Sequence, residues 1–462
     1  MRYLLVASAA SILLTASGTA TSRAAAPESS QPETRGTAEQ LIELGDQLSD
    51  NDHYQEAIDA FTRALQEEPD NGAALAGRSI AYAATNKLDE AVRDADNAER
   101  IIGDSALVHR ARGLIAERRS DNNRAIAEYT AALLKDPADK WSLYSRAWLF
   151  QQAQKDVAAL ADADTFVEAH PTAAEGYILR GRILLAQQKF TVALLDADRL
   201  VRLFPDQPKM LASAADIYNG ARDRQRAVQA IDRAIAIQPD YYLYRYMRGI
   251  FRRWDDFDGR RSDFNAALEL DPGNLDVLTE LAQLDFKQHR WTDAIAGFSA
   301  ELGKQPTDYG VLAYRSMAYL NSGQLSLAQS DHANALRLAS GPNDLNNICW
   351  AYANEGFALD WALEACNRAL KAKPGQSRYL ANRGLAELRL GQLDRALEDD
   401  EHAIASNAKE ARAIYGRAVI LFRQGNAGAA HDERQHALDI DPRIEETFEQ
   451  YGVTDFENAS TP

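Results

Sequence analysis

Arginine and acidic residues recur in this 462-residue chain at a constant separation. Sixteen residues separate the two members of the pairs Arg78 and Asp94, Arg112 and Glu128, Arg146 and Asp162, Arg180 and Asp196, Arg315 and Asp331, Arg383 and Asp399, and Arg417 and Glu433. Arg248 is followed by Asp263 at a separation of fifteen. A planar guanidinium can hold an anionic ligand, or it can bind a carboxylate of its own chain through two parallel hydrogen bonds. Because each arginine has its own carboxylate, we favour structural ion pairs.

No combination of residues in the sequence indicates catalysis. The sequence has no Gly-rich phosphate loop, no nucleophile elbow and no zinc-protease helix. Its eight histidines are scattered, and His431 and His436 have a spacing that places two side chains on different faces of a helix. The sequence therefore predicts a protein that is not an enzyme and that holds no metal and no cofactor.

The elements that carry these residues repeat with a period of 34. Small residues stand at this spacing at Ala57, Ala91, Ala125, Ala159, Ala193 and Ala227 and, after one deleted residue, at Ala294, Ala328, Ala362, Ala396 and Ala430. The eighth place of each repeat is also small, for example Gly113 and Gly181, with Trp350 as the one misfit. Proline ends nine of the repeats, where it stops a helix and turns the chain.

This period, together with its helix–turn–helix content, resembles the tetratricopeptide repeat (TPR) family. The resemblance implies an all-α fold, a right-handed superhelical solenoid of about twelve repeats over residues 38–442. The repeats are expected to begin at Ala38, Gly72, Ala106, Lys140, Ala174, Pro208, Tyr242, Leu275, Tyr309, Asn343, Ser377 and Ala411. An amphipathic helix over 443–452 is expected to cap the last repeat, and residues 25–37 and 453–462 are predicted to be a disordered linker and tail.

The first 24 residues are predicted to be a signal peptide. Arg2 supplies a positive start, an apolar run follows, and small residues suit cleavage after Ala20 or Ala24. An uncleaved anchor is the alternative, but the run falls short of the ~20 residues that span a bilayer. We therefore expect export to the periplasm, with no integral membrane segment after cleavage. The net charge of −17 argues against nucleic acid as a partner.

The resemblance also assigns a ligand-binding surface, because TPR first helices line a concave groove with their second, fifth, ninth, twelfth and thirteenth places. Carried onto this sequence, these places form an aromatic cluster of Arg110, Arg118, Trp141, Tyr144, Trp148 and Arg182, continued by Tyr246, Arg253 and Trp254. Such residues suit an extended peptide or a sugar chain. The alternative is that the rings pack against neighbouring repeats.

A second, basic cluster comprises Arg378, Arg389, Arg412 and Arg423. Four positive charges on the groove of an acidic protein would attract an anionic ligand. The alternative, slightly favoured, is solvated arginines paired with acidic neighbours such as Glu387 and Glu410. The resemblance further implies that each arginine of the pairs faces its carboxylate across the two helices of one repeat.

The two cysteines, Cys349 and Cys366, lie in one repeat, on facing sides of its helix pair. In an exported protein this arrangement predicts a disulfide, and in a cytosolic one it indicates two buried thiols. The sequence as a whole predicts an exported scaffold for protein–protein interaction in the bacterial cell envelope, with a protein or peptide partner. Two alternatives are a protein that binds or helps export an envelope polysaccharide and a regulatory subunit of an envelope enzyme.

Overall fold

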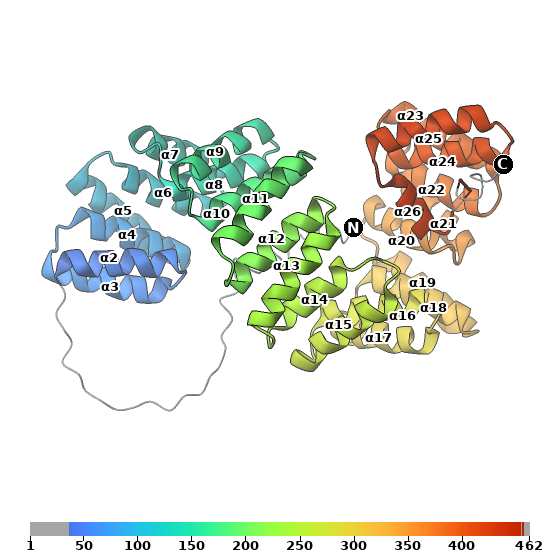
Figure 1. The fold of residues 1–462 in the computed structure, drawn as a ribbon, viewed down its shortest axis with the longest axis horizontal. Helices are drawn as coiled ribbons and strands as arrows, with labels where there is room; N and C mark the ends of the chain where they lie inside the picture. Colours follow the sequence, from blue (N-terminus) through green and yellow to red (C-terminus); the bar gives the residue numbers. More distant parts are fainter. Residues whose placement is uncertain (1–36, 454, 457–462) are drawn as a thin grey trace. The chain divides into compact units, whose positions relative to one another are not determined.

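The computed structural model describes residues 37–453 and 455–456, and this part of the chain folds into α-helices without any strand (Figure 1). The predicted signal peptide, and the predicted linker up to residue 36, lie outside the described residues. The chain divides at Arg253 and Trp254 into two compact units. We call them the N-terminal unit and the C-terminal unit. The division falls within the seventh repeat, between its two helices.

Helices follow one another in pairs throughout both units. Those of the N-terminal unit are α2 (Ala38–Asp50), α3 (Tyr54–Glu67), α4 (Gly72–Ala84), α5 (Leu88–Ile102), α6 (Ala106–Arg118), α7 (Asn122–Lys135), α8 (Lys140–Gln152), α9 (Asp156–Ala169), α10 (Ala174–Ala186), α11 (Phe190–Leu203), α12 (Pro208–Gly220), α13 (Arg224–Ile237) and α14 (Tyr242–Phe251). Those of the C-terminal unit are α15 (Phe257–Leu270), α16 (Leu275–Lys287), α17 (Trp291–Lys304), α18 (Tyr309–Asn321), α19 (Leu325–Leu338), α20 (Pro342–Glu355), α21 (Leu359–Ala372), α22 (Ser377–Arg389), α23 (Leu393–Ser406), α24 (Ala411–Arg423), α25 (Ala427–Ile440) and α26 (Ile444–Gln450).

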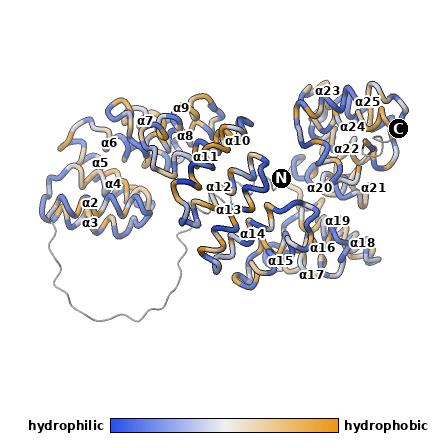
Figure 2. The backbone as a smooth tube through the Cα atoms, viewed as in Figure 1, coloured by the Kyte–Doolittle hydropathy of each residue, from blue (hydrophilic) through white to orange (hydrophobic). Residues whose placement is uncertain are grey.

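A tight turn joins the two helices of each repeat, and it uses the same backbone conformation repeatedly. Its left-handed residue is Asn86 in the second repeat, Ser120 in the third and Gly391 in the eleventh, with φ of 61°, 60° and 73°. The helices pack closely because the predicted small places are buried. A Cβ atom on Gly113 would lie 2.6 Å from a ring carbon of Tyr129, so only glycine fits there. Figure 2 shows apolar and polar residues interspersed along the helices, as expected for amphipathic helices.

The predicted arginine–carboxylate pairs are confirmed at most positions. Both carboxylate oxygens accept hydrogen bonds from the guanidinium in the pairs Arg78–Asp94, Arg146–Asp162, Arg180–Asp196, Arg315–Asp331 and Arg383–Asp399, at 2.6–3.0 Å. Arg417 makes a single bond of 2.7 Å to Glu433. These aspartates are almost completely buried, so the pairs lie between the two helices of each repeat. In these pairs, most of the guanidinium and of the carboxylate is shielded from water.

The predicted pair of Arg112 and Glu128 is wrong. Arg112 binds Glu99 at 2.7 Å and Asp96 at 3.0 Å, both on the preceding helix α5. Glu128 accepts a hydrogen bond of 2.8 Å from His109 instead. His109 competes for the carboxylate, and the long arginine side chain reaches another pair of acids.

Six of the arginines at the seventh place of the repeats also have a partner sixteen residues earlier, which the spacing did not predict. Nη1 of the arginine donates to a polar side chain on the second helix of the preceding repeat. These bonds are Arg78 to Thr62 (3.2 Å), Arg146 to Thr130 (3.0 Å), Arg180 to Asp164 (3.1 Å), Arg248 to Asp232 (2.7 Å), Arg315 to Ser299 (3.0 Å) and Arg383 to Asn367 (2.7 Å). One guanidinium therefore joins three helices from two successive repeats.

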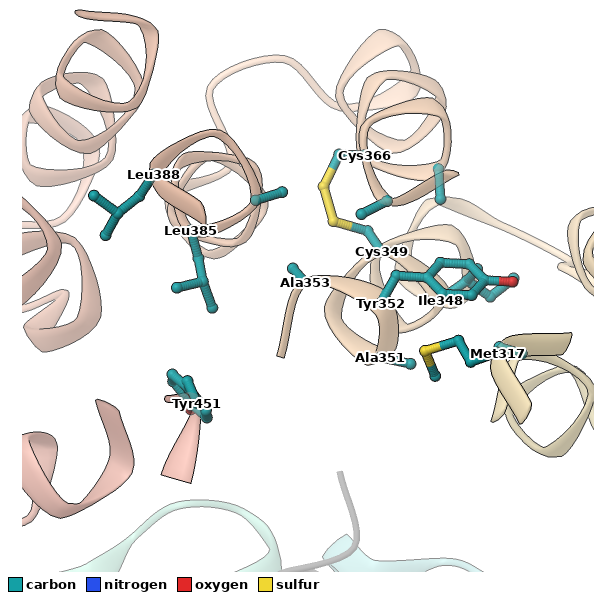
Figure 3. Packing of buried hydrophobic residues seen from close by; sticks show 14 of the residues in the cluster. Met317, Ile348, Cys349, Ala351, Tyr352, Ala353, Cys366, Leu385, Leu388 and Tyr451 are labelled. Carbon is teal, nitrogen blue, oxygen red and sulfur yellow. A yellow bond between two sulfur atoms is a disulfide. The ribbon is translucent and has the colours of Figure 1, made fainter. Parts of the chain in front are cut away.

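The predicted disulfide is present in the structure. Cys349 of α20 and Cys366 of α21 are bonded, with their Cα atoms 5.2 Å apart, and both are fully buried (Figure 3). Helix α20 begins at Pro342, one residue before the expected repeat start. Counted from Pro342, Cys349 is the eighth residue and Trp350 the ninth, so the small eighth place is kept and Trp350 is no misfit.

Candidate binding surfaces

The predicted site residues lie mostly on the first helices of the repeats. We call the side chains at the second, fifth, ninth, twelfth and thirteenth places of these helices the inner face. In the N-terminal unit, Arg110 and Arg118 come from α6, Trp141, Tyr144 and Trp148 from α8, Arg182 from α10 and Tyr246 from α14. Their local structure is ordinary helix, so their spacing follows from the repeat.

Two of these residues are held by the protein itself. The indole N–H of Trp141 donates to Asp50 at 2.9 Å, and the ammonium of Lys140 binds the same carboxylate at 2.7 Å. Lys140 also lies 4.7 Å from the centre of the Trp141 ring. Arg110 binds Asp139 at 2.8 Å. The end of α2 is thus tied to the start of α8, and neither Trp141 nor Arg110 is free for a ligand.

Three other residues of the aromatic cluster are available. Arg118 is exposed and Arg182 is half-buried, and neither makes a hydrogen bond or ion pair with the residues that the structure describes. Trp148 is half-buried and stacks on no other described ring. Tyr144 packs edge-on against Trp141, and burial raises the pKa of its hydroxyl, which the charge of Arg182 opposes. Arg182 therefore acts electrostatically on Tyr144.

Sequence reasoning missed an acidic residue on the same surface. Asp216 is the ninth residue of α12 and makes no hydrogen bond to the described residues. Burial raises its pKa to about 6, and the charge of Arg182 opposes this shift. Trp148, Arg182 and Asp216 are thus the ninth residues of three successive first helices. The repeat spacing could have identified Asp216, since it places these three residues in one row.

The predicted continuation of the aromatic cluster is only partly on a helix. Tyr246 belongs to α14 and packs against the core of the N-terminal unit. Arg253 and Trp254 do not lie on a first helix, because α14 ends at Phe251. They follow it in the turn before α15, where the repeat is one residue shorter. Trp254 belongs to the C-terminal unit and Arg253 to the N-terminal unit.

Three of the four arginines of the basic cluster are bound within the C-terminal unit. Arg389 donates to the carbonyls of Asn354, at 2.9 Å, and of Tyr451. Arg412 lies 4.9 Å from the centre of the Trp350 ring and 3.4 Å from Glu410. Arg423 binds both carboxylate oxygens of Asp455, at 2.7 and 2.9 Å.

Arg378 is the remaining arginine of this cluster. It is exposed and makes no ion pair with a described residue. Glu387, expected among the acidic neighbours, likewise makes no such pair, and burial raises the pKa of its carboxyl to about 7. The chain itself therefore occupies three of the four arginines of the basic cluster and leaves Arg378 exposed.

Other classes of site are not indicated. Within residues 37–453, 455 and 456, no group of three or more His, Cys, Asp or Glu side chains is placed to hold a metal ion. In the same part of the chain, no helix has both the length and the apolar character needed to cross a membrane.

Comparison with known proteins identifies the repeats. Two family models described as tetratricopeptide repeat match residues 48–115 and residues 144–208, 178–242 and 382–442. This is a tetratricopeptide-repeat chain. Its all-helical solenoid fold agrees with that assignment, and the predicted family is confirmed.

Similar proteins share parts of this repeat array. Tetratricopeptide repeat protein 13 of Homo sapiens is 28% identical over 126 residues, which cover 27% of this chain and 14% of that protein. U-box domain-containing protein 70 of Oryza sativa subsp. japonica is 25% identical over 278 residues, covering 55% and 32%. The chain thus spans less than a third of these relatives. The crystal structure of yeast Tom70 is 15% identical with a TM-score of 0.43, covering 91% of this chain and 96% of that one.

Proposed function

We propose that this tetratricopeptide-repeat chain is an exported scaffold of the bacterial cell envelope, whose N-terminal unit binds an extended segment of a partner protein. Repeat scaffolds of this family bind protein or peptide partners, and the inner face is preformed, so binding orders little of the scaffold itself. The export component rests on the leader-like residues 1–24, and on a disulfide typical of oxidising compartments.

One observation carries the choice of surface. Trp148, Arg182 and Asp216 offer an aromatic ring, a cation and an acid from α8, α10 and α12, and neither charged group makes a hydrogen bond or an ion pair with the described residues. A half-buried arginine that is not hydrogen-bonded to a carboxylate can form a charge-assisted hydrogen bond that is stronger than one in open water. The fitting partner segment carries an apolar residue, an acid and a base in succession.

An envelope polysaccharide fits this surface less well. Sugar binding would use the aromatic rings, yet the N–H edge of Trp141 is taken by Asp50 and its face by Lys140. A regulatory subunit of an envelope enzyme would use the same surface for one particular partner. Identifying the captured partner separates this alternative from a general scaffold.

The test is affinity capture from native envelope with wild type, with Trp148→Ala and with Arg182→Ala. We expect the captured protein to bind each variant about tenfold or more weakly, because both residues are central and charged or aromatic contacts dominate such surfaces. Arg63→Ala is the matched control, since Arg63 is exposed on the second helix α3. A captured set that is unchanged by both inner-face variants would rule out this surface.

The export component needs its own measurement. Cell fractionation followed by mass determination of the amino terminus should recover the chain in the periplasm, cut after Ala20 or Ala24. Recovery in the cytoplasmic fraction with Met1 retained contradicts export and leaves the peptide-binding proposal standing. Binding of the purified chain to a glycan array, abolished by Trp148→Ala, would favour the polysaccharide alternative.

A further inference from the structure

Residues 444–453, 455 and 456 lie against the inner face of the C-terminal unit. Helix α26 is followed by Tyr451, Gly452 and Val453 and then by Asp455 and Phe456, and we call these residues, from Ile444 onward, the C-terminal segment. The predicted tail from residue 453 is packed in this region, with Val453 4% exposed and Phe456 half-buried. Figure 1 shows α26 in dark red among the helices of the C-terminal unit, where it contacts α24 and α25.

Aromatic side chains of the segment contact aromatic side chains of the repeats. Tyr451 packs edge-on against Trp350 of α20, with ring centres 5.2 Å apart. Phe448 lies 4.5 Å from Tyr415 of α24. Phe456 contacts both Tyr415 and Phe422 of α24, at 5.8 and 5.0 Å. Aromatic pairs of this kind contribute about 0.5–1.5 kcal/mol beyond area burial.

Arginines of the predicted basic cluster supply the polar contacts. Arg423 binds the Asp455 carboxylate through two hydrogen bonds, and Arg389 donates to the backbone carbonyl of Tyr451. On the other side, Arg434 of α25 binds Glu445 through two hydrogen bonds of 2.8 and 2.7 Å. Arg434 also lies over the Phe456 ring at 5.6 Å.

These contacts extend further than a cap requires. Covering the last repeat needs contact with α24 and α25 alone, which α26 makes. Tyr451 in addition reaches Trp350 of α20 and Arg389 of α22, in the two preceding repeats. Tyr415, Phe422, Arg389 and Arg423 are the fifth, twelfth and thirteenth places of their helices, where the family binds ligands.

We propose that the C-terminal segment is an intramolecular ligand of α20, α22 and α24, and that this surface binds in its place a partner segment with two aromatic residues followed by a carboxylate. Charge complementarity selects the carboxylate, because Arg423 binds both oxygens of Asp455 in a protein with net charge −17. The surface is separate from Trp148, Arg182 and Asp216, so this inference does not rest on the proposed function.

The outer part of the segment is weakly enough held to exchange. Arg423 is 32% and Asp455 16% exposed, and ion pairs at such positions contribute little in water. Helix α26 has seven residues, too few for a helix that is stable by itself. The attached segment nevertheless competes strongly, because its short tether gives it a high effective concentration.

The experiment uses the full chain and a labelled peptide of sequence TFEQYGVTDFE, which reproduces residues 447–457. The receptor variant carries Asp455→Ala and Phe456→Ala, which weaken the attached segment and leave the buried Phe448 and Val453 in place. We expect the peptide to bind this variant about tenfold more tightly than wild type, since the site is then free for a larger fraction of the time.

Two further variants test the site itself. Arg423→Ala in the weakened receptor should reduce peptide affinity by up to about fivefold, and replacing the aspartate of the peptide by alanine should add nothing to that loss. Arg378→Ala is the matched control on α22 and should leave affinity unchanged. The proposal is wrong if the weakened receptor binds no peptide, if Arg378→Ala causes the same loss, or if sedimentation shows that a second copy of the chain occupies the surface.

Hydrogen exchange keeps the proposal testable if the weakened receptor does not fold. In wild type, the amide of Val453 is bonded to the carbonyl of Phe448 at 2.9 Å and should exchange faster when excess peptide is added. Amides of α22 should not change. Exchange of Val453 only together with α24, with or without peptide, would identify the segment as a permanent part of the fold. Arg182→Ala should have no effect in either assay.

Discussion

The inner faces of the two units carry similar residues in different situations. In the N-terminal unit, Arg118 and Arg182 make no hydrogen bond or ion pair with the described residues, and Trp148 stacks on no described ring. In the C-terminal unit, Arg389 and Arg423 are bound by the C-terminal segment, and Trp350 contacts both Tyr451 and Arg412. The repeat decides where a side chain lies. Whether the side chain is available to a ligand depends on which other residues of the chain contact it.

The difference suggests two modes of ligand binding on one scaffold. A surface without an internal occupant binds as soon as a partner arrives, and one with an attached occupant binds only what displaces it. Four predictions test this comparison, and the first concerns what the two units should share.

Breaking a ladder pair should cost the same in either unit. Asp196→Ala and Asp399→Ala each leave a half-buried arginine without its main carboxylate, which should lower the free energy of unfolding by about 3–5 kcal/mol. Asp96→Ala is the control, because Asp96 is 57% exposed, and it should cost about 1 kcal/mol or less. Urea denaturation measures all three. If only one of the two aspartate variants lost stability, the arginine–carboxylate pairs would not have the same structural role in both units.

Removing the disulfide should affect only the C-terminal unit. Cys349→Ala with Cys366→Ala opens a loop of 17 residues and should lower stability by about 3 kcal/mol. Hydrogen exchange should therefore increase in α20 and α21 and stay unchanged in α10 and α11. Chemical reduction of wild type provides the control and should give the same pattern. Increased exchange in the N-terminal unit would contradict independent behaviour of the two units.

Equivalent arginine substitutions should separate the two inner faces. Arg389→Ala leaves the carbonyls of Asn354 and Tyr451 without a donor and should cost about 1.5–3 kcal/mol. Arg182→Ala breaks no bond to the described residues and should change stability by less than about 0.5 kcal/mol. Denaturation midpoints of the two variants provide the measurement. Equal losses would show that Arg182 has a structural role.

The smallest effect concerns pH. The pKa of Asp216 is raised to about 6 and that of Glu387 to about 7, both by burial. For an acid with a raised folded-state pKa, stability is greatest below the unfolded pKa near 4 and is lost as pH rises through the folded pKa. Asp216→Asn and Glu387→Gln should therefore become more stable relative to wild type between pH 4 and 7. A constant difference over this range would show that neither group titrates as inferred.

Local pattern accounts for most of the fold but for less of the binding surfaces. The period of 34 marks where the first helices begin, except at α20, where Pro342 favours the first helical position. The pair of Arg112 and Glu128 failed because several carboxylates lie within reach of one long side chain. The spacing in the sequence cannot show which of these carboxylates the arginine binds.

The occupied inner face could not be predicted from any local pattern. It depends on contacts between Tyr451 or Asp455 and residues 32 to 101 positions earlier, such as Arg423 and Trp350. Two signals were present in the sequence. Trp350 stood where a small residue was expected, and Phe456 interrupted an otherwise polar tail. Neither signal names its partner.

The arginines that reach both sixteen residues forward and sixteen back have a mechanical consequence. Arg146 holds Asp162 in its own repeat and Thr130 in the one before, so sliding one repeat past the next must break bonds at both ends of a single side chain. Neighbouring repeats are therefore joined by side-chain hydrogen bonds as well as by packing. Pulling on the chain ends should lengthen each unit in steps of whole repeats. The arginine hydrogen bonds between repeats should set the force needed for each step.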